Sequence, residues 1–426
     1  MKILIVSRTP WNISNSFGNT FTNLFGGMQD IDIYHICCQH GAIENTPAKK
    51  TFQMTDKSVM KSIIFRKSRI GRLVNNNENE DFKDNSWVSK SAAEKRSQFA
   101  YFARDLIWKL GAWRANGELR AFLDDVKPDA VYLPIYASCY MCDVGQYITE
   151  YLGVPVVGHI TDNVFANPAD ASFFEKLYKA GLHKKIDKLM GMCAYFEVFA
   201  ENMKQEYEKR FKKKFYVIGK GVSVADIPSG VEFCADKDEI HFVYTGNLGD
   251  GRFKTLGKIG AALRKYSKNR VGILDIYSAT RLTETMEREL GGFPNIRLHG
   301  FVSSDKVREI QKSADFLVHV EGFGNDAVET VGMSFSTKII DYMMCGKPIF
   351  AVGDIRINSI KVLAEHKAAV VACDDDEIGT AVSDILDGNA DIEQLLKNSK
   401  DYLINYRDIL KIQNGIRNRL QKLINR

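Results

Sequence analysis

The stretch VHVEGFGNDAVETVGMSFSTKIIDYMMCGKPIFAVGD, residues 318–354, carries the clearest pattern in the chain. Its second half predicts a helix that is capped by Ser336 and ended by Gly346, a residue that suits the left-handed position after a helix. Pro348 then opens the apolar run 349–352, which predicts a buried strand. Helices that alternate with buried strands are typical of a parallel α/β sheet.

The start of this helix is a candidate anion site. Free backbone N–H groups and the positive end of the helix dipole suit a phosphate. Lys338 lies in the first turn, where a cation is unfavourable for the helix alone but useful beside a bound anion. Asp341 follows on the same face and can accept hydrogen bonds from sugar or ribose hydroxyls. An ordinary capped helix with a surface ion pair explains the same residues, so both interpretations stay open.

Length and composition limit the protein class. With 426 residues, 45% of them hydrophobic, the chain is expected to be globular and to form two domains. The formal charge of +5 is small for this length and does not indicate a nucleic-acid partner. The eight cysteines lie mostly in apolar runs without disulfide-framework spacing, which fits a reducing cytosol.

Neither a metal nor a membrane-spanning segment is expected. Cys139 and Cys142 form one CxxC pair, but no second pair completes a zinc set, so core packing is the favoured role. The opening MKILIVSRTP enters a strand directly, with too short an apolar run for a signal peptide. No window approaches the roughly 20 apolar residues of a spanning helix. We therefore expect a cytoplasmic protein.

The first half opens like a Rossmann unit. A strand at 2–7, a loop at 8–19 and a helix at 20–25 follow one another, but the glycines lack the GxGxxG spacing of a dinucleotide site. A loop after a first strand lies at the carboxyl edge of the sheet, where open α/β folds bind ligands. The candidate acceptor-side residues in this loop are Asn15, Ser16 and Gly18.

Residues 61–113 contain a candidate membrane-facing surface. KSIIFRKSRIGRLV at 61–74 interleaves apolar and basic residues, and the polar run at 75–86 predicts a surface excursion. A helix predicted at 99–123 carries Phe102, Leu106, Leu110 and Trp113 on one face, with Trp108 off that line. Such a basic, aromatic patch suits a membrane surface. A helix packed on the sheet beside a solvated basic loop is the favoured alternative.

Two polar side chains end a later strand of the first half. A strand predicted at 154–160 runs into Thr-Asp-Asn, which places His159 and Asp162 at its carboxyl end, a common position for catalytic groups. Asp162 is a candidate base, or alternatively the cap of the next helix.

The strand–helix pattern restarts after the polar segment 228–238. We therefore predict domains at 1–228 and 229–390, followed by terminal helices at 391–426 that pack toward the first domain. Three loops of the second domain, 246–255, 300–303 and 321–338, are expected to converge at its carboxyl edge. Their cations can neutralise a diphosphate, and no cluster has metal-ligand spacing.

The motifs YTGNLGDGR at 244–252, HGFV at 299–302, EGFG at 321–324 and STKIIDYMMCGKPI at 336–349 resemble the donor domain of GT-B glycosyltransferases of the retaining family 4 type. The resemblance implies two Rossmann-like domains that face each other across a cleft. It places the nucleotide diphosphate sugar on the residues Gly246, Asn247, Arg252, Lys254, Phe301, Val302, Ser336, Thr337, Lys338 and Asp341.

Within that set the resemblance implies separate roles. Arg252 and Lys338 would hold the diphosphate, the backbone around Phe301-Val302 the base, and Asp341 the ribose. Glu321 would contact the donor sugar, and His159 would be the histidine at the acceptor side. The wide spacing between Glu321 and Asp341 departs from the family pattern and leaves Glu329 as the alternative acid.

The implied reaction is transfer of a hexosyl unit to a glycan or polyprenyl-linked acceptor, retaining and without metal or cofactor, in surface-polysaccharide synthesis at the inner face of the membrane. Arg252, Lys338, Glu321 and Asp162 are the catalytic candidates, with Asp162 as base if the enzyme inverts. A nucleotide-sugar 2-epimerase and a non-catalytic partner protein on the same fold remain the alternatives.

Overall fold

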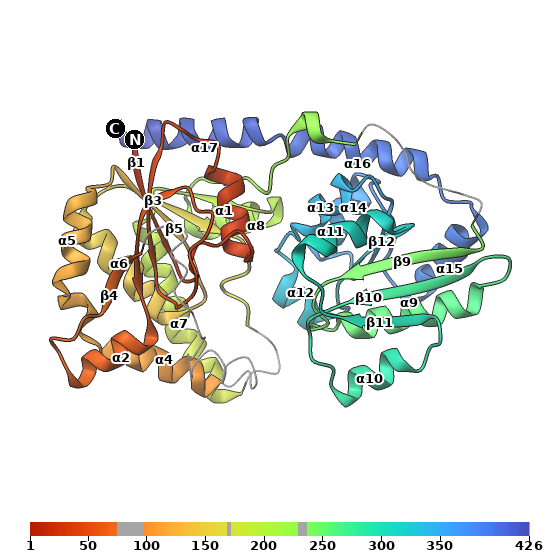
Figure 1. Ribbon diagram of the computed structural model, residues 1–426, viewed down its shortest axis with the longest axis horizontal. Coiled ribbons are helices and arrows are strands. Elements are labelled where there is room, and N and C mark those ends of the chain that lie inside the picture. The colour runs from red at the N-terminus through yellow and green to blue at the C-terminus, as the bar shows by residue number, and fades with distance from the viewer. Residues whose placement is uncertain (75–97, 168–171, 229–236, 426) are drawn as a thin grey trace. The chain divides into compact units, whose positions relative to one another are not determined.

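The computed structural model describes residues 1–74, 98–167, 172–228 and 237–425. The chain divides into two compact units (Figure 1): unit 1 is Met1–Gly219 with Lys411–Arg426, and unit 2 is Lys220–Leu410. The division at Gly219 precedes the polar segment where the sequence placed the domain boundary. Each unit is built on its own largely parallel sheet, which confirms the predicted α/β class with two sheet domains.

Unit 1 contains an eight-stranded sheet in the order β4-β3-β2-β1-β5-β6-β7-β8. All neighbouring strands are parallel except β4, which is antiparallel to β3. The strands are β1 (Lys2–Ser7), β2 (Asp32–Cys37), β3 (Ala48–Met54), β4 (Gly71–Val74), β5 (Ala130–Pro134), β6 (Val156–Ile160), β7 (Tyr195–Val198) and β8 (Phe215–Val217). Apolar side chains of the central strands are buried because helices cover both faces.

The helices of unit 1 connect these strands. They are α1 (Ser16–Phe25), α2 (Asp56–Ile64), α4 (Gln98–Leu110), η1 (Ala112–Ala115), α5 (Gly117–Val126), α6 (Cys139–Leu152), α7 (Phe173–Met192) and α8 (Glu201–Phe211), together with most of α17 (Ile409–Ile424).

The sequence missed β3, α2 and β4, because polar residues obscure their periodicity. The predicted surface excursion at 75–86 lies outside the described residues. The helix predicted at 99–123 is interrupted at Gly111, where a Cβ atom would collide with the Val59 side chain.

The two tryptophans of the predicted membrane patch are buried. Trp108 donates its indole N–H to Asp56 Oδ1 at 2.7 Å, and Trp113 donates to the Trp108 carbonyl at 2.6 Å. Both side chains are at most 1% exposed. The prediction that tryptophan contributes to this surface is therefore wrong, because each indole packs and hydrogen-bonds inside unit 1.

Unit 2 contains a parallel six-stranded sheet in the order β11-β10-β9-β12-β13-β14. The strands are β9 (Glu239–Thr245), β10 (Val271–Tyr277), β11 (Ile296–Gly300), β12 (Phe316–Val320), β13 (Ile349–Val352) and β14 (Val370–Ala372). The helices are α9 (Arg252–Tyr266), α10 (Glu284–Gly291), α11 (Ser304–Ser313), α12 (Asn325–Val331), α13 (Lys338–Met344), α14 (Asn358–Glu365), α15 (Asp375–Asp387) and α16 (Ile392–Tyr406), with a short turn η2 (Val224–Asp226).

The two terminal helices belong to different units. In unit 2, α16 is held by hydrogen bonds from Asn398 and Ser399 to the carbonyls of Lys367 and Ala368. In unit 1, α17 is held by Arg419, whose guanidinium meets the fully buried carboxylate of Glu197 on β7. The segment 391–426 therefore divides between the units.

Candidate functional site

The carboxyl edge of the unit 2 sheet brings together the loops that the sequence singled out. After β9 ends at Thr245, Gly246 passes so close to the Nζ atom of Lys338 that a Cβ atom there would collide with it. Gly251 then adopts φ +80°, a left-handed conformation that glycine tolerates, and α9 begins at Arg252. The predicted loop to Thr255 is wrong in its end point, because the helix starts four residues before the predicted Leu256.

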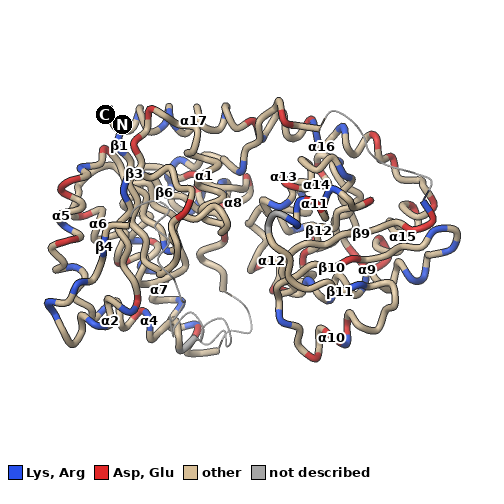
Figure 2. Tube along the Cα trace, in the orientation of Figure 1, with Lys and Arg blue, Asp and Glu red and all other residues tan. Residues whose placement is uncertain are grey.

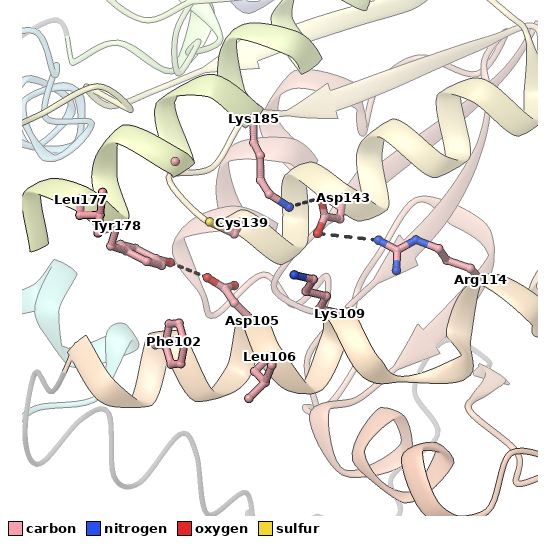
Figure 3. A pocket seen from close by; sticks show the side chains of 11 residues that line it. Phe102, Asp105, Leu106, Lys109, Arg114, Cys139, Asp143, Leu177, Tyr178 and Lys185 are labelled. Atoms are coloured by element: carbon pink, nitrogen blue, oxygen red, sulfur yellow. Dashed lines mark hydrogen bonds and ion pairs between the residues drawn. The ribbon is translucent and has the colours of Figure 1, made fainter. Parts of the chain in front are cut away.

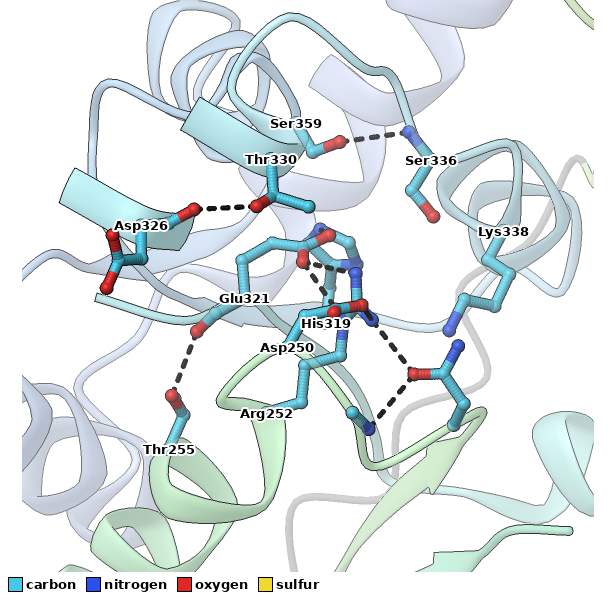
Figure 4. Close-up of polar contacts among 12 residues, drawn as sticks. Asp250, Arg252, Thr255, His319, Glu321, Asp326, Thr330, Ser336, Lys338 and Ser359 are labelled. Atoms are coloured by element: carbon cyan, nitrogen blue, oxygen red, sulfur yellow. Dashed lines mark hydrogen bonds and ion pairs between the residues drawn. The ribbon is translucent and has the colours of Figure 1, made fainter. Parts of the chain in front are cut away.

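Arg252 and Glu321 form a buried ion pair at the centre of this edge (Figure 4). Arg252 donates from Nε and Nη2 to Glu321 Oε2 at 3.0 and 2.7 Å, and from Nη1 to Asn247 Oδ1 at 2.9 Å. Thr255 donates from Oγ1 to the Glu321 carbonyl at 2.9 Å. Because every one of these groups is held by a partner, the guanidinium has a fixed position next to the loop after β9.

Lys338 is the second cation of the site. Its Nζ atom donates to the Thr245 carbonyl at 3.2 Å and lies 5.2 Å from the centre of the Tyr244 ring. Burial, reinforced by the neighbouring Arg252, lowers the pKa of Lys338 to about 8. An anion that entered here would meet a desolvated cation, for which electrostatic attraction is strong.

The predicted cap of α13 differs in detail. Thr337, not Ser336, is the N-cap residue, and no side chain caps the helix. Ser336 instead donates its backbone N–H to Ser359 Oγ at 2.9 Å. Gly346 has φ +66° directly after the helix, which confirms the left-handed position predicted for it.

Asp341 contacts a cation that the sequence did not indicate. Its Oδ1 atom forms a salt bridge with Nζ of Lys220, the first residue of unit 2. The Asp341 side chain remains 45% exposed, so a ligand hydroxyl can reach it. No local pattern reveals this pair, because its members are 121 residues apart.

The remaining donor-side candidates lie on the surface of unit 2. Lys254 is exposed in the first turn of α9, and Phe301 is 75% exposed just after β11, next to the half-buried Val302. Glu329 is exposed on α12, in the segment that separates Glu321 from Asp341. Glu321 contacts Arg252 at 2.7 Å, and Asp250 contacts the same guanidinium at 3.1 Å.

His319 was missed by the sequence analysis. It is 2% exposed on β12, its Nε2 atom lies 3.6 Å from Glu321 Oε1, and this nitrogen has no hydrogen-bond partner among the described residues. Burial lowers the pKa of His319 to about 3, so the imidazole is neutral at physiological pH. The sequence could have indicated this residue, because residues two apart on a strand share one face and His319 is two positions before Glu321.

The unit 1 candidates lie at the carboxyl edge of its sheet, with unequal access to solvent. His159 is 2% exposed, and Tyr132 Oη lies 3.1 Å from its Nδ1 atom. Burial lowers the pKa of His159 to about 3, so in this position it is a neutral core residue. Asp162 is exposed and accepts from Thr161 Oγ1 at 2.9 Å. Ser172 caps the next helix, which removes the cap role considered for Asp162.

The loop after β1 forms the start of α1. Asn15 is the N-cap, and its side chain accepts from the backbone N–H of Gly18 at 2.8 Å. Gly18 is buried so tightly against the Asn12 backbone that a Cβ atom has no room. Of the four predicted acceptor-side residues, Asn15, Ser16, Gly18 and His159, Ser16 alone presents an exposed side chain.

The described residues contain neither a candidate metal site nor a helix that could span a membrane. Within the described ranges, no three or more His, Cys, Asp or Glu side chains gather in a way that could hold a metal ion. Among the same residues, every helix is too short or too polar to cross a bilayer. In the CxxC pair, burial raises the pKa of Cys139 to about 11 and of Cys142 to about 12, as expected of packed thiols.

Comparison with solved structures identifies the fold. Anabaena HepE in complex with UDP superposes with a TM-score of 0.65 at 11% identity, covering 99% of this chain and 100% of that one. Sucrose-phosphate synthase from Thermosynechococcus elongatus superposes with a TM-score of 0.65 at 11% identity, covering 99% of this chain and 98% of that one. The lipopolysaccharide outer core galactosyltransferase WaaB superposes with a TM-score of 0.59 at 12% identity, covering 99% of this chain and 100% of that one.

No protein-family model matches the sequence, and no curated protein sequence matches it either. The likeness therefore lies in the arrangement of the chain, over nearly its whole length, and not in sequence identity. These neighbours include nucleotide-sugar glycosyltransferases, and this chain has the fold that they share, the GT-B fold.

Proposed function

We propose that the protein is a glycosyltransferase that moves a hexosyl unit from a nucleotide diphosphate sugar to a hydroxyl of a glycan or lipid-linked acceptor. The observation that carries the proposal is the cluster of Arg252, Glu321 and Lys338 at the carboxyl edge of unit 2, in a chain with the GT-B fold. Solved structures of HepE hold UDP and UDP-glucose, which supports a donor of this class.

The two cations have the properties that a leaving diphosphate requires. Arg252 is fixed by Glu321, and Lys338 is desolvated beside the glycine loop, so neither has to reorganise as negative charge develops. We assign the ribose hydroxyls to Asp341 and the donor sugar to the vicinity of Glu321. These side-chain cations would stabilise the diphosphate without a metal ion.

We propose a retaining transfer. The bond between the anomeric carbon and the diphosphate oxygen breaks, and the acceptor oxygen bonds to the anomeric carbon on the same face. The acceptor proton passes to the departing diphosphate oxygen, so no strong protein base is required. In an inverting reaction the exposed Asp162 would accept that proton instead.

We further propose that unit 1 contacts a membrane surface, in keeping with surface-polysaccharide or glycoconjugate synthesis on a lipid-linked acceptor. With the tryptophans buried, the exposed apolar side chains described in this region include Met60, Ile64, Phe65, Leu73, Tyr101, Phe102, Leu106 and Leu110. Basic residues accompany them along α2 and the segment before β4 (Figure 2). Apolar anchors with adjacent cations suit an anionic bilayer surface.

The donor site is tested by thermal shift with UDP, GDP, ADP, CMP and dTDP on the wild type and on Lys338→Met. A nucleotide at about 100 times its Kd should add about 2.7 kcal/mol of stability to the wild type. We expect one diphosphate to shift the wild type and to act weakly on the variant. If no nucleotide shifts the wild type, the non-catalytic alternative is favoured.

The reaction is tested with the nucleotide sugar of the base so identified, with and without a glycan acceptor. NMR of the product should show the donor's anomeric configuration retained. A change of sugar stereochemistry without acceptor would instead identify an epimerase.

Membrane contact is tested by sedimentation with anionic and neutral liposomes. The double substitution Ile64→Glu with Phe65→Glu should release the protein from anionic vesicles. Equal sedimentation of wild type and variant would refute the contact.

A further inference from the structure

A pocket in unit 1 has no role in the reaction described above. It lies between α4, α6 and α7 (Figure 3), encloses about 600 Å³, and is open to solvent. Its walls come from residues far apart in the sequence: α4 contributes Phe102 to Lys109, the start of α6 contributes Cys139 and Asp143, and α7 contributes Leu177 to Lys185. All of these belong to one unit, so the pocket is a property of unit 1 alone.

One end of the pocket is cationic. Lys109, Arg114 and Lys185 line it together with Asp143. Asp143 pairs with both Lys185 and Arg114, the latter at 3.7 Å, so a single carboxylate is shared by two cations. Lys109 is exposed and has no ion-pair partner among the described residues. This end therefore carries positive charge that its own carboxylate does not balance.

The second carboxylate of the pocket is already engaged. Asp105 accepts from Tyr178 Oη at 2.5 Å and from the backbone N–H of Tyr140 at 3.1 Å. Burial raises the pKa of Asp105, while these two donors hold the carboxylate in place. Asp105 thus positions Tyr178 and the start of α6, and leaves the cations at the other end available.

The opposite end of the pocket is apolar and continues onto the surface. Phe102, Leu106 and Leu177 lie on this side, away from Arg114 and Lys185 (Figure 3). Leu177 is 64% exposed, and Phe173 and Phe174 in the preceding turn of α7 are 76% and 79% exposed. Exposed aliphatic and aromatic side chains beside a cavity indicate a contact with apolar material.

We propose that this pocket binds a phosphate-bearing lipid chain, with the phosphate at Lys109, Arg114 and Lys185 and the chain along Phe102, Leu106 and Leu177. Charge complementarity selects the anionic head, and the apolar side selects a chain over a soluble anion. The proposal rests on the membrane contact proposed for unit 1. It does not depend on the donor site of unit 2, so either can fail alone.

Two glycines of α7 allow a clean test. Gly181 lines the pocket, and a Cβ atom there meets nothing within 4 Å, so Gly181→Leu should fill the space without straining the helix. Gly191 lies on the same helix, is equally open, and is not part of the pocket. Gly191→Leu is therefore the matched control.

The experiment is calorimetric titration of the full chain with monomeric decyl phosphate, inorganic phosphate and decanol. We expect decyl phosphate to bind to the wild type and to Gly191→Leu, with at least tenfold weaker binding to Gly181→Leu and to Lys185→Gln. Inorganic phosphate and decanol should bind at least tenfold more weakly than decyl phosphate to the wild type.

Three results would overturn the proposal. Unchanged binding in Gly181→Leu would place the ligand outside the pocket. Equal affinity for inorganic phosphate would reduce the site to a free-anion site, and equal affinity for decanol would reduce it to an apolar groove. Because the readout is binding without any nucleotide, none of these results bears on glycosyl transfer.

Discussion

The Arg252 site of unit 2 and the α4–α6–α7 pocket of unit 1 both pair cations with carboxylates, but in different surroundings. The side chains of Arg252 and Glu321 are 13% and 6% exposed, whereas Arg114 and Lys185 are 42% and 41% exposed beside Asp143 at 20%. A desolvated pair fixes geometry, and a solvated pair exchanges partners at little cost. We infer that unit 2 holds its ligand by preorganised groups and unit 1 by groups that rearrange.

The largest effect is expected from breaking the buried pair. Arg252→Met should lower the free energy of unfolding by about 3–5 kcal/mol, because it leaves the carboxylate of Glu321 buried without its partner. Urea denaturation measures this. Adding Glu321→Gln to the same chain should recover most of the stability but none of the nucleotide affinity. If the Arg252→Met protein were as stable as the wild type, the ion pair between Arg252 and Glu321 would not be desolvated.

Lys338→Met should separate binding from stability. Loss of the charged hydrogen-bond donor should weaken binding of the nucleotide diphosphate by about 2 kcal/mol. The unfolding free energy should not fall, because the substitution removes a buried cation whose pKa shows that burial disfavours it. Calorimetric titration measures the nucleotide affinity, and urea denaturation of the same preparation measures the unfolding free energy. Parallel losses of affinity and stability would argue for a purely structural lysine.

The pH dependence of donor binding should follow the same lysine. In the free protein the pKa of Lys338 is about 8, and a bound diphosphate raises it. Affinity should therefore be flat below pH 8 and fall by about tenfold per pH unit above it, because binding then requires uptake of a proton. In Lys338→Met this fall should disappear, and its persistence there would assign the titration to another group.

The smallest effect is expected from filling the unit 1 pocket. Gly181→Leu should raise the unfolding free energy by about 0.5–1 kcal/mol, because it replaces glycine inside a helix at a position with open space. Nucleotide affinity should be the same as in the wild type. A change in nucleotide affinity would show that the two sites are coupled.

The unit 2 site could be predicted because its signals are local. Arg252, Glu321 and Lys338 each follow a buried strand or begin a helix, and glycines mark their loops. The end of the loop after β9 was misplaced, because Gly251 starts α9 without a side-chain cap and so leaves no capping residue to recognise. The partner of Asp341 was missed because Lys220 lies far away in sequence.

Unit 1 was less predictable from the sequence, because contacts between residues far apart in the chain determine its strands, its buried side chains and its pocket. The strand AKKTFQM at 48–54 has little alternation and exists because it pairs with β2. Trp108 was noted as lying off the apolar face of its helix, but its burial depends on Asp56 of α2. The pocket requires three helices whose contributions span residues 102–185, a juxtaposition that no periodicity encodes.

The contact between Glu197 and Arg419 has a consequence for the order of folding. During synthesis Glu197 leaves the ribosome 222 residues before its partner, and all of unit 2 is made in between. Until α17 docks, the buried carboxylate of Glu197 keeps its hydrogen bond from Tyr132 Oη but lacks its cation, so the core of unit 1 is less stable than in the finished protein. Unit 2 is continuous and can fold first, which makes the earliest sheet to be translated the last to reach its final stability.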